Sequence, residues 1–147
     1  MEKMKLKGSF DVKLFGPDGK LKQHETTDNL VVDAGFDGIS QRCFSTETGS
    51  ASFNYISIGS GASAAAAGDT TLDNVLATQQ ATYAHSDGDA NFSLTTTFAA
   101  GVGTGSVNEY AVQNGSPTGT LFNRALTGLV TKNAADSLQI VFAGSLS

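Results

Sequence analysis

The chain has 147 residues, of which 39% are hydrophobic and 16% charged, with 17 glycines and a formal net charge of −5. A chain of this length fits one domain, which buries roughly 68–70% of the surface that the unfolded chain exposes, so a core can form without metals or disulfides. Disorder requires more charge and fewer apolar residues, and we exclude it. Cys43 is the only cysteine, which excludes an intrachain disulfide and a cysteine-based zinc cluster.

The charge is unevenly distributed along the chain. Residues 1–22 carry six basic and three acidic side chains (+3), whereas the other residues carry three basic and eleven acidic ones (−8). An acidic body repels polyanions, so we expect no nucleic acid as a partner. There is no apolar run of about 20 residues and no apolar signal-peptide core near Met1. We therefore expect no membrane contact and synthesis in a cytoplasm.

An alternation of apolar and polar residues predicts the first strand. From Met4 to Leu14 the even positions are mostly apolar and the odd positions mostly polar, which is typical of a strand with one buried face. The Gly-Pro-Asp-Gly sequence at 16–19 favours a tight turn. Residues 20–25 are predicted to return as a second strand, which makes an N-terminal hairpin.

Residues 1–8 are predicted to form a basic N-terminal arm or an edge strand. Their alternating pattern suits pairing with a partner strand by β-augmentation, and their charge suits docking onto a negatively charged neighbour, such as another copy of the chain. The alternative is a solvated edge strand whose lysines prevent aggregation. The candidate assembly arm consists of Met1, Glu2, Lys3, Met4, Lys5, Leu6 and Lys7.

The period of the pattern changes after residue 30. Four apolar residues follow at helical spacing, namely Val32, Phe36, Ile39 and Cys43. They define one face of a helix, and Asp33 is predicted to cap it. Two glycines inside the helix cost about 1 kcal/mol each, so packing on a sheet must hold it. Cys43 on the apolar face is interpreted as a small core residue rather than a nucleophile.

The rest of the chain is predicted to be β-structure. We expect strands at 53–58, 78–85, 91–99, 107–112 and 120–126, and a last strand in which Leu138, Ile140, Phe142 and Leu146 share a face. A small-residue loop at 59–68 and one helical turn at 69–75 lie between the first two. Some eight short strands with regular turns favour a mainly β fold, an antiparallel β-sandwich or barrel with one short α-helix packed on it.

No motif predicts a catalytic, cofactor or metal site. Residues 59–64 match the G-x-G-x-x-A fingerprint of dinucleotide-binding proteins, but no acidic residue follows about 20 positions later and the flanks are antiparallel in character. This segment is interpreted as a flexible exit from a strand. His24 and His85 lie beside turns, without the spacing of zinc ligands and without the nucleophile elbow of a serine hydrolase. Both are interpreted as solvated surface residues.

Asp87, Asp89 and Asn91 reproduce the opening of a calcium-binding loop. Phe92 stands where that loop needs glycine, and Phe98 stands where it needs a bidentate glutamate. A hairpin turn is therefore the preferred interpretation, and weak calcium binding by Asp87 and Asp89 stays open.

Seven segments carry a likeness to a known family and cover most of the chain from about residue 29 onward. They read NLVVDAG (29–35), NYISIGSG (54–61), GDTTL (68–72), TFAAG (97–101), EYAVQN (109–114), LFNRA (121–125) and VTK to IVF (130–142). In this order they resemble small virion proteins of tailed bacteriophages, found among capsid decoration (cement) and tail-associated structural proteins. The resemblance implies a β-sandwich or jelly-roll-like fold that oligomerises and clamps neighbouring capsid subunits.

The expected function is that of a non-catalytic capsid decoration protein, which stabilises the assembled head by binding its outer surface. The expected partners are the major capsid protein and further copies of the chain, as a homodimer or homotrimer, and the expected location is the virion. The first alternative is a tail, fibre or baseplate protein that binds a host surface or anchors a fibre. The second is a carbohydrate-binding or hydrolytic β-sandwich.

Overall fold

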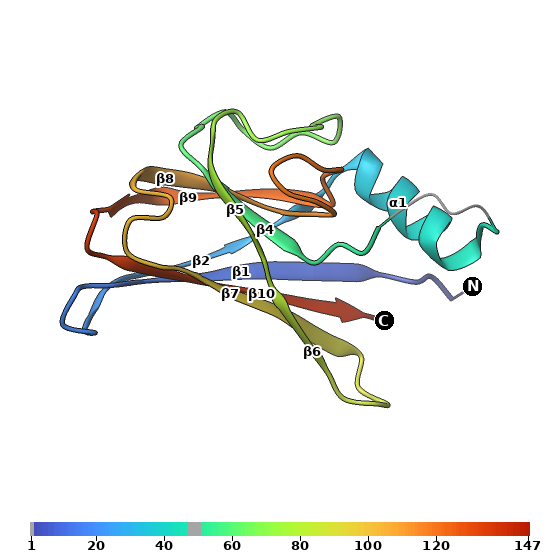
Figure 1. Cartoon of the computed structure of the whole chain (residues 1–147). Coiled ribbons are helices and arrows are strands. Elements are labelled where there is room, and N and C mark those ends of the chain that lie inside the picture. The colour runs from blue at the N-terminus through green and yellow to red at the C-terminus, as the bar shows by residue number, and fades with distance from the viewer. Residues whose placement is uncertain (1, 47–50) are drawn as a thin grey trace.

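Two antiparallel five-stranded sheets face each other in the computed structural model, which describes residues 2–46 and 51–147, and a helix lies at one end (Figure 1). The elements are β1 (Leu6–Phe15), β2 (Leu21–Asp28), β3 (Leu30–Val31), α1 (Asp33–Phe44), β4 (Tyr55–Gly59), β5 (Val75–Gln80), β6 (Thr82–His85), β7 (Asn91–Phe98), β8 (Gly105–Gln113), β9 (Asn123–Lys132) and β10 (Ser137–Leu146). The strand orders are β2-β1-β10-β7-β6 in the first sheet and β3-β9-β8-β4-β5 in the second. The prediction of a mainly β antiparallel sandwich with one short helix is confirmed.

Strands that are neighbours in sequence pair with each other in β1–β2, β4–β5, β6–β7 and β8–β9. β10 lies between β1 and β7, so both ends of the chain belong to the first sheet. The predicted N-terminal hairpin is confirmed. Its turn is closed by a hydrogen bond from the Gly19 N–H to the Gly16 carbonyl, and Gly19 has φ +78°, a conformation that favours glycine.

The strand predicted at 78–85 is two strands, because the chain passes from one sheet to the other at Ala81. Before this residue β5 pairs with β4, and the Ala81 N–H donates to the Asn54 carbonyl at 2.8 Å. After it β6 pairs with β7. The segment therefore connects the two layers along one side of the sandwich, as Figure 1 shows.

Two other predicted elements have different boundaries in the structure. Residues 69–74 are irregular with several bends rather than a helical turn, and Val75 begins β5. The strand predicted at 120–126 begins at Asn123 and continues to Lys132. Its start is displaced because the Asn123 side chain takes a ladder position, accepting the Val112 N–H through Oδ1 at 2.7 Å.

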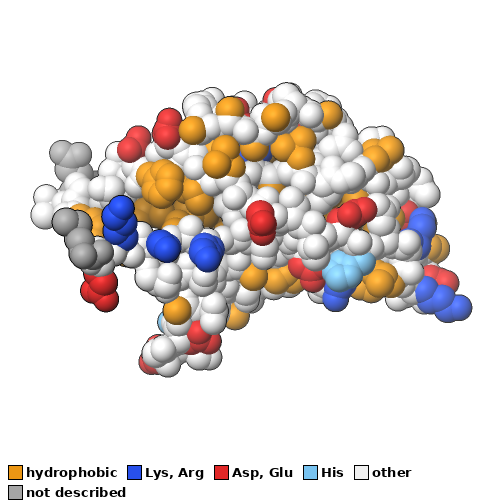
Figure 2. Space-filling model, turned by 180° about the vertical axis from the view of Figure 1, so that it is seen from behind, with side chains coloured by type: hydrophobic (Ala, Val, Ile, Leu, Met, Phe, Trp, Pro, Cys, Tyr) orange, Lys and Arg blue, Asp and Glu red, His pale blue; other side chains and the backbone are white. Residues whose placement is uncertain are grey.

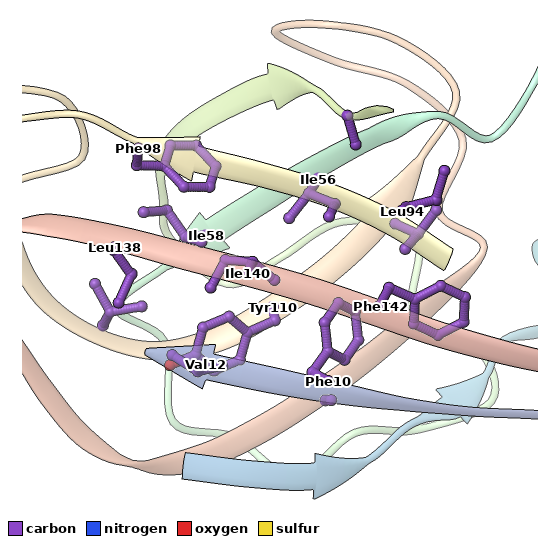
Figure 3. Packing of buried hydrophobic residues seen from close by; sticks show 14 of the residues in the cluster. Phe10, Val12, Ile56, Ile58, Leu94, Phe98, Tyr110, Leu138, Ile140 and Phe142 are labelled. Carbon is purple, nitrogen blue, oxygen red and sulfur yellow. The ribbon is translucent and has the colours of Figure 1, made fainter. Parts of the chain in front are cut away.

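The core lies between the sheets and consists of apolar residues that alternate along the strands. Its buried members include Phe10, Val12, Ile56, Ile58, Leu94, Phe98, Tyr110, Leu138, Ile140 and Phe142 (Figure 3). The Phe10 ring lies 5.2 Å from that of Phe142 and 5.9 Å from that of Tyr110, which joins the two sheets. Such aromatic pairs contribute about 0.5–1.5 kcal/mol beyond their buried area. The predicted buried faces are confirmed, except that Met4 is 74% exposed and Leu146 is 47% exposed.

The helix packs through its glycines rather than through the predicted apolar face. Gly35 and Gly38 are buried, whereas Phe36 is 55% exposed and Cys43 is exposed. The interpretation of Cys43 as a core residue is therefore wrong. A Cβ atom on Gly35 would lie 2.1 Å from the Phe122 carbonyl oxygen. The helix backbone approaches the second sheet more closely than a side chain permits, which turns the larger residues outward.

Two residues of the predicted face are nevertheless buried or partly buried. Val32 is fully buried in a second apolar cluster, and Ile39 is partly buried against the core between the sheets. Val32 itself is the N-cap residue and no side chain caps the helix, so the predicted capping by Asp33 is wrong. The Asp33 carboxylate still lies in the first turn, where negative charge is favourable. Within the described ranges no helix is long and apolar enough to cross a membrane.

A group of charged residues closes the opposite end of the sandwich. Asp136 is 1% exposed and accepts hydrogen bonds from the Lys22 ammonium at 2.9 and 3.1 Å and from the Asn133 N–H at 3.0 Å. These bonds, more than the nearby charge of Lys132, hold the pKa of Asp136 below its usual value despite its burial. Burial lowers the pKa of Lys132, whose ammonium donates to the Ala99 carbonyl at 3.0 Å. The Lys22–Asp136 pair ties the β1–β2 hairpin to the turn before β10.

Replacing Gly35 with alanine is expected to destabilise the fold. Alanine gains about 1 kcal/mol in helix propensity, but its Cβ would push the helix off the Phe122 carbonyl, at a cost of roughly 1–3 kcal/mol or more. Chemical denaturation measures the net change. Gly68→Ala is the matched control, because nothing lies within 4 Å of that added Cβ, and we expect it to be neutral or slightly stabilising. An equally stable Gly35→Ala variant would contradict the close approach.

Asp136→Asn is expected to remove stability that depends on pH. Because the pKa of Asp136 is lowered in the folded state, its contribution is complete above the unfolded pKa and disappears as pH falls through the folded one. The variant should melt below the wild type at about pH 7, and the gap should close toward about pH 2.5. Calorimetry at both pH values checks this, and a gap that stays constant with pH would rule out the carboxylate charge as its cause.

Candidate functional site

Arg124 and Glu109 form a buried ion pair on the outer face of the second sheet. The Arg124 side chain is 1% exposed and that of Glu109 is 0% exposed. The Nε and Nη2 atoms of Arg124 donate to Oε2 of Glu109 at 3.2 and 3.0 Å. Its Nη1 also donates to Asp69 and its Nη2 to Asp73, both at 3.1 Å. These four residues are called the ionic cluster below.

The Glu109 carboxylate is also held by backbone groups of the β4–β5 loop. Its Oε1 accepts the N–H groups of Gly61 at 3.0 Å and Asn74 at 2.8 Å, and its Oε2 accepts the N–H of Asp73 at 3.0 Å. Charge-assisted hydrogen bonds of this kind replace the water that a carboxylate loses on burial. They also explain the missing helical turn at 69–75, because two of its N–H groups point to Glu109.

The nucleotide-like fingerprint at 59–64 lies in this loop and binds the protein's own carboxylate. No helix follows it. A Cβ atom on Gly61 would lie 2.6 Å from Glu109 Oε1, so the glycine permits the close approach. Arg124 also donates to the Ala64 carbonyl at 3.3 Å. Side chains of the ionic cluster therefore hold the backbone of the loop at Gly61 and Ala64. The interpretation of this loop as a flexible strand exit is wrong.

Hydrogen bonds within the cluster keep its charges in place. Burial alone would lower the pKa of Arg124, but its bonds to Glu109 and Asp69 and the charge of Asp73 raise it above the usual value. The pKa of Asp73 is lowered, chiefly by hydrogen bonds from the hydroxyl and N–H groups of Ser63 and further by Arg124. Arg124 and Asp73 therefore stay charged at neutral pH, and the cluster acts as a structural clamp on the loop.

The loop and the helix together cover the outer face of the second sheet. Leu72, 5% exposed, packs with three other buried residues in a second apolar cluster formed by Val32, Leu72, Ala111 and Leu121. β8 is buried on both faces over 109–113, which explains why its sequence does not alternate. The segments at 29–35, 54–61, 68–72, 109–114 and 121–125 contribute residues to this outer layer or to the ionic cluster.

Sequence reasoning did not identify Glu109 and Arg124 as partners. Each stands inside a predicted strand, between residues that are otherwise uncharged. A lone charge in a strand interior is the available signal, because a buried charge requires a partner. The sequence does not reveal which partner, since 15 positions and a sheet register separate the two.

The histidines and the aspartates of the calcium-like loop lie apart from the cluster. His24 contacts the Asp11 carboxylate, and its side chain is 43% exposed. His85 Nδ1 lies 2.9 Å from the Asn91 carbonyl. Asp89 accepts the Asn91 backbone and side-chain N–H groups at 2.9 and 2.8 Å, as in a hairpin turn. Over residues 2–46 and 51–147 no group of three or more His, Cys, Asp or Glu side chains is placed to hold a metal ion.

The candidate arm is attached to the end of the chain. Lys5 exchanges two backbone hydrogen bonds with Ser147, at 2.6 and 2.9 Å, and Leu6 begins β1 opposite Leu146. Glu2, Lys3, Met4, Lys5 and Lys7 are exposed, Leu6 is partly buried, and Met1 lies outside the described residues. From residue 5 onward the arm therefore extends β1 in the first sheet, and it pairs on one side, with residues 146–147.

β2 ends before it reaches this extension. The β1–β2 ladder stops at the pair Ser9–Asp28, and the Asn29 N–H still donates to the Gly8 carbonyl at 3.3 Å. The chain then leaves for the second sheet as β3. A groove of about 570 Å³ remains between β1, β3 and α1, lined by Leu6, Lys7, Asn29, Leu30, Val31 and Phe36 among others.

Exposed apolar side chains gather around this groove at the helix end of the sandwich. The exposed fractions are 74% for Met4, 40% for Leu30, 55% for Phe36, 77% for Phe44 and 47% for Leu146. In Figure 2 a hydrophobic cluster lies beside a row of basic side chains at this end. None of the ion pairs within the described chain involves Lys3, Lys5 or Lys7. These eight residues are called the helix-end surface, and such an apolar area rimmed by polar groups is typical of a binding surface.

An apolar cleft of about 230 Å³ opens beside the helix-end surface, between α1 and the two sheets. Its lining includes Leu6, Ile39, Cys43, Phe53, Phe92 and Phe142. The Phe122 ring lies 5.4 Å from that of Phe53 and 6.1 Å from that of Phe142. Phe53, Phe92 and Phe142 belong to the core or pack against it, so the cleft is an extension of the core to the surface.

Arg124→Met is expected to destabilise the protein by about 3–5 kcal/mol, because it leaves the Glu109 carboxylate buried without its cation. The amides of Gly61, Asp73 and Asn74 should then exchange hydrogen faster. Denaturant unfolding and hydrogen exchange measure the two effects. Lys20→Met, at an exposed lysine of the β1–β2 turn, is the control and should stay within about 0.5 kcal/mol of the wild type. Unchanged stability and unchanged exchange in Arg124→Met would refute the clamp.

No protein-family model, no curated protein and no solved structure matches this chain. The structure has two charged features: an ionic cluster directed inward onto the chain's own loop, and an outward apolar surface whose three lysines form no ion pair with any described residue.

Proposed function

We propose that the chain is a capsid decoration (cement) protein of a tailed bacteriophage, which binds the outside of the head and holds neighbouring capsid subunits together. The observation that supports this is the helix-end surface, where exposed apolar groups adjoin three lysines that form no ion pair with residues 2–46 or 51–147. The resemblance of the seven segments supplies the viral assignment. The jelly-roll-like connectivity that it implies belongs to the same proposal.

The physical role follows from linkage. A protein that binds the assembled shell but not its separate subunits stabilises the shell by RT ln(1 + c/Kd) per site, where c is its free concentration and Kd its dissociation constant. The apolar side chains of the helix-end surface supply affinity by burial, while the lysines accelerate encounter with a negatively charged shell. The partners are the major capsid protein and further copies of the chain, as a homodimer or homotrimer.

A tail, fibre or baseplate component is the rival proposal. Its binding surface would have the same chemistry, because both kinds of protein bury apolar groups against another virion protein. The two differ in the place that the chain occupies in the particle. Immunogold labelling of intact virions separates them, since a decoration protein labels heads and the rival labels tails.

Lys5→Glu is expected to weaken binding to undecorated heads by roughly threefold or more at low salt, with the difference shrinking at high salt. Lys20→Glu reverses the same charge in the turn at the other end of the sandwich and serves as the control. Co-sedimentation of each variant with purified heads measures the affinity. Equal losses in both variants would show that only net charge matters, and no binding of the wild type to heads would refute the decoration role.

A further inference from the structure

We infer that the groove beside β1 receives an extended segment of a partner protein, one in which apolar and acidic side chains alternate. The segment pairs with β1 in the position that β2 leaves after Asp28. This inference rests on the proposed function for the partner's identity as a virion protein. The pairing itself is argued from the backbone, the groove and the charges.

The backbone of Leu6 faces the open side of the sheet. Lys5 and Ser147 exchange both of their hydrogen bonds, so the Lys5 N–H and C=O groups point toward β10. Successive residues of an antiparallel ladder point to opposite sides, which directs the Leu6 groups into the groove. The residue opposite Leu6 is Leu146, and its N–H also points away from the β1–β10 ladder, because it donates to the Ala90 carbonyl at 2.9 Å. Leu6 thus offers a donor and an acceptor to an added strand.

The walls of the groove specify apolar side chains on the inner face of that strand. Leu30 is 40% exposed and Phe36 is 55% exposed, and both line the groove with Leu6 and Val31. An added strand directs every second side chain inward. Covering Leu30 and Phe36 would remove apolar surface from water and stabilise the complex by about 25 cal/mol per Å².

The outer face of the strand meets lysines. Lys5 and Lys7 alternate with Leu6, so they lie on the opposite face of β1, and both are exposed. Side chains directly across a strand pair are about 4.5–5.5 Å apart, and opposite charges there contribute roughly 0.2–1 kcal/mol per pair. Pairing with the arm of a second copy would place lysine against lysine. The charges therefore favour acidic residues on a different chain.

Asn29 is the polar group of this groove that lacks a partner. Neither Oδ1 nor Nδ2 of its side chain forms a hydrogen bond, although both atoms are buried. The amide packs on Gly8, where a Cβ would lie 2.6 Å from Oδ1. An unsatisfied buried amide costs about 1–3 kcal/mol. A peptide group of the added strand supplies both missing partners once the side chain rotates into the groove.

The test uses the full chain and two six-residue peptides, one alternating Val and Glu and one alternating Val and Lys. Titration followed by NMR should show tighter binding of the Glu peptide, by about tenfold at low salt, with amide shifts at residues 4–8 and 29–31. Equal binding of both peptides, or shifts elsewhere on the protein, would overturn the inference.

Leu6→Pro sharpens the test because proline lacks the N–H group that faces the groove. The ladder with β10 does not use that group, and proline is tolerated on the open side of an edge strand. Leu6→Ala is the matched control, since it also shortens the side chain but keeps the N–H. We expect the proline variant to bind the Glu peptide about tenfold more weakly than the alanine variant. Equal affinities would contradict strand pairing.

Asn29→Ala provides a second variant in case Leu6→Pro does not fold. Losing an amide without partners should leave the melting temperature unchanged or raised, while the Glu peptide binds about threefold more weakly. A variant with unchanged affinity would remove Asn29 from the site. Head binding is measured separately. If the wild type binds heads and Leu6→Pro binds them as tightly as Leu6→Ala, the groove inference fails and the decoration role stands. If the wild type binds the Glu peptide but does not bind heads, the groove inference stands and the decoration role fails.

Discussion

The buried pair of Glu109 and Arg124 is the constraint on which the outer half of the molecule depends. A carboxylate and a guanidinium with almost no exposure are tolerable only when each is paired and hydrogen-bonded. The β4–β5 loop supplies what the pair lacks, namely three backbone N–H groups for Glu109 and the Asp69 and Asp73 carboxylates for Arg124. Loop and pair therefore form together, and losing either leaves buried charge behind.

This clamp makes the sandwich asymmetric. The second sheet is covered on its outer face by the loop, which brings Leu72 over Ala111, and by α1, whose Gly35 lies against Phe122. The opposite end of the sandwich is closed by Asp136 and its lysine. Neither the ionic cluster nor the Lys22–Asp136 pair closes the helix end. There β2 leaves the first sheet and the helix turns Phe36 outward, which concentrates exposed apolar surface in one place. The lysines of the arm form no ion pair with the part of the chain that the structure describes.

The sequence predicts the parts of the fold that obey a simple period. β1, β7 and β10 each have one buried face, so their alternation marks them, and the Gly-Pro-Asp-Gly turn marks the first hairpin. Prediction from the sequence fails where tertiary packing overrides the hydrophobic period. Phe36 and Cys43 have helical spacing, but Gly35 and Gly38 set the contact. The loop at 59–68 has the composition of a flexible linker, yet a carboxylate from 48 residues later holds Gly61. Lys5 and Lys7 identify the arm in the sequence. The unpaired position beside β1 does not follow from the sequence, because it depends on the residue at which β2 leaves the first sheet.

We propose that the helix end is the face by which the protein joins a larger assembly. Cryo-electron microscopy of phage heads with the protein bound would show which face makes the contacts. Density from a neighbouring virion protein is expected to cover Leu30 and Phe36 and to continue the first sheet beside Leu6. Contacts made instead through the opposite end, at the 16–19 turn and the 133–136 turn, with the helix end left in solvent, would contradict it.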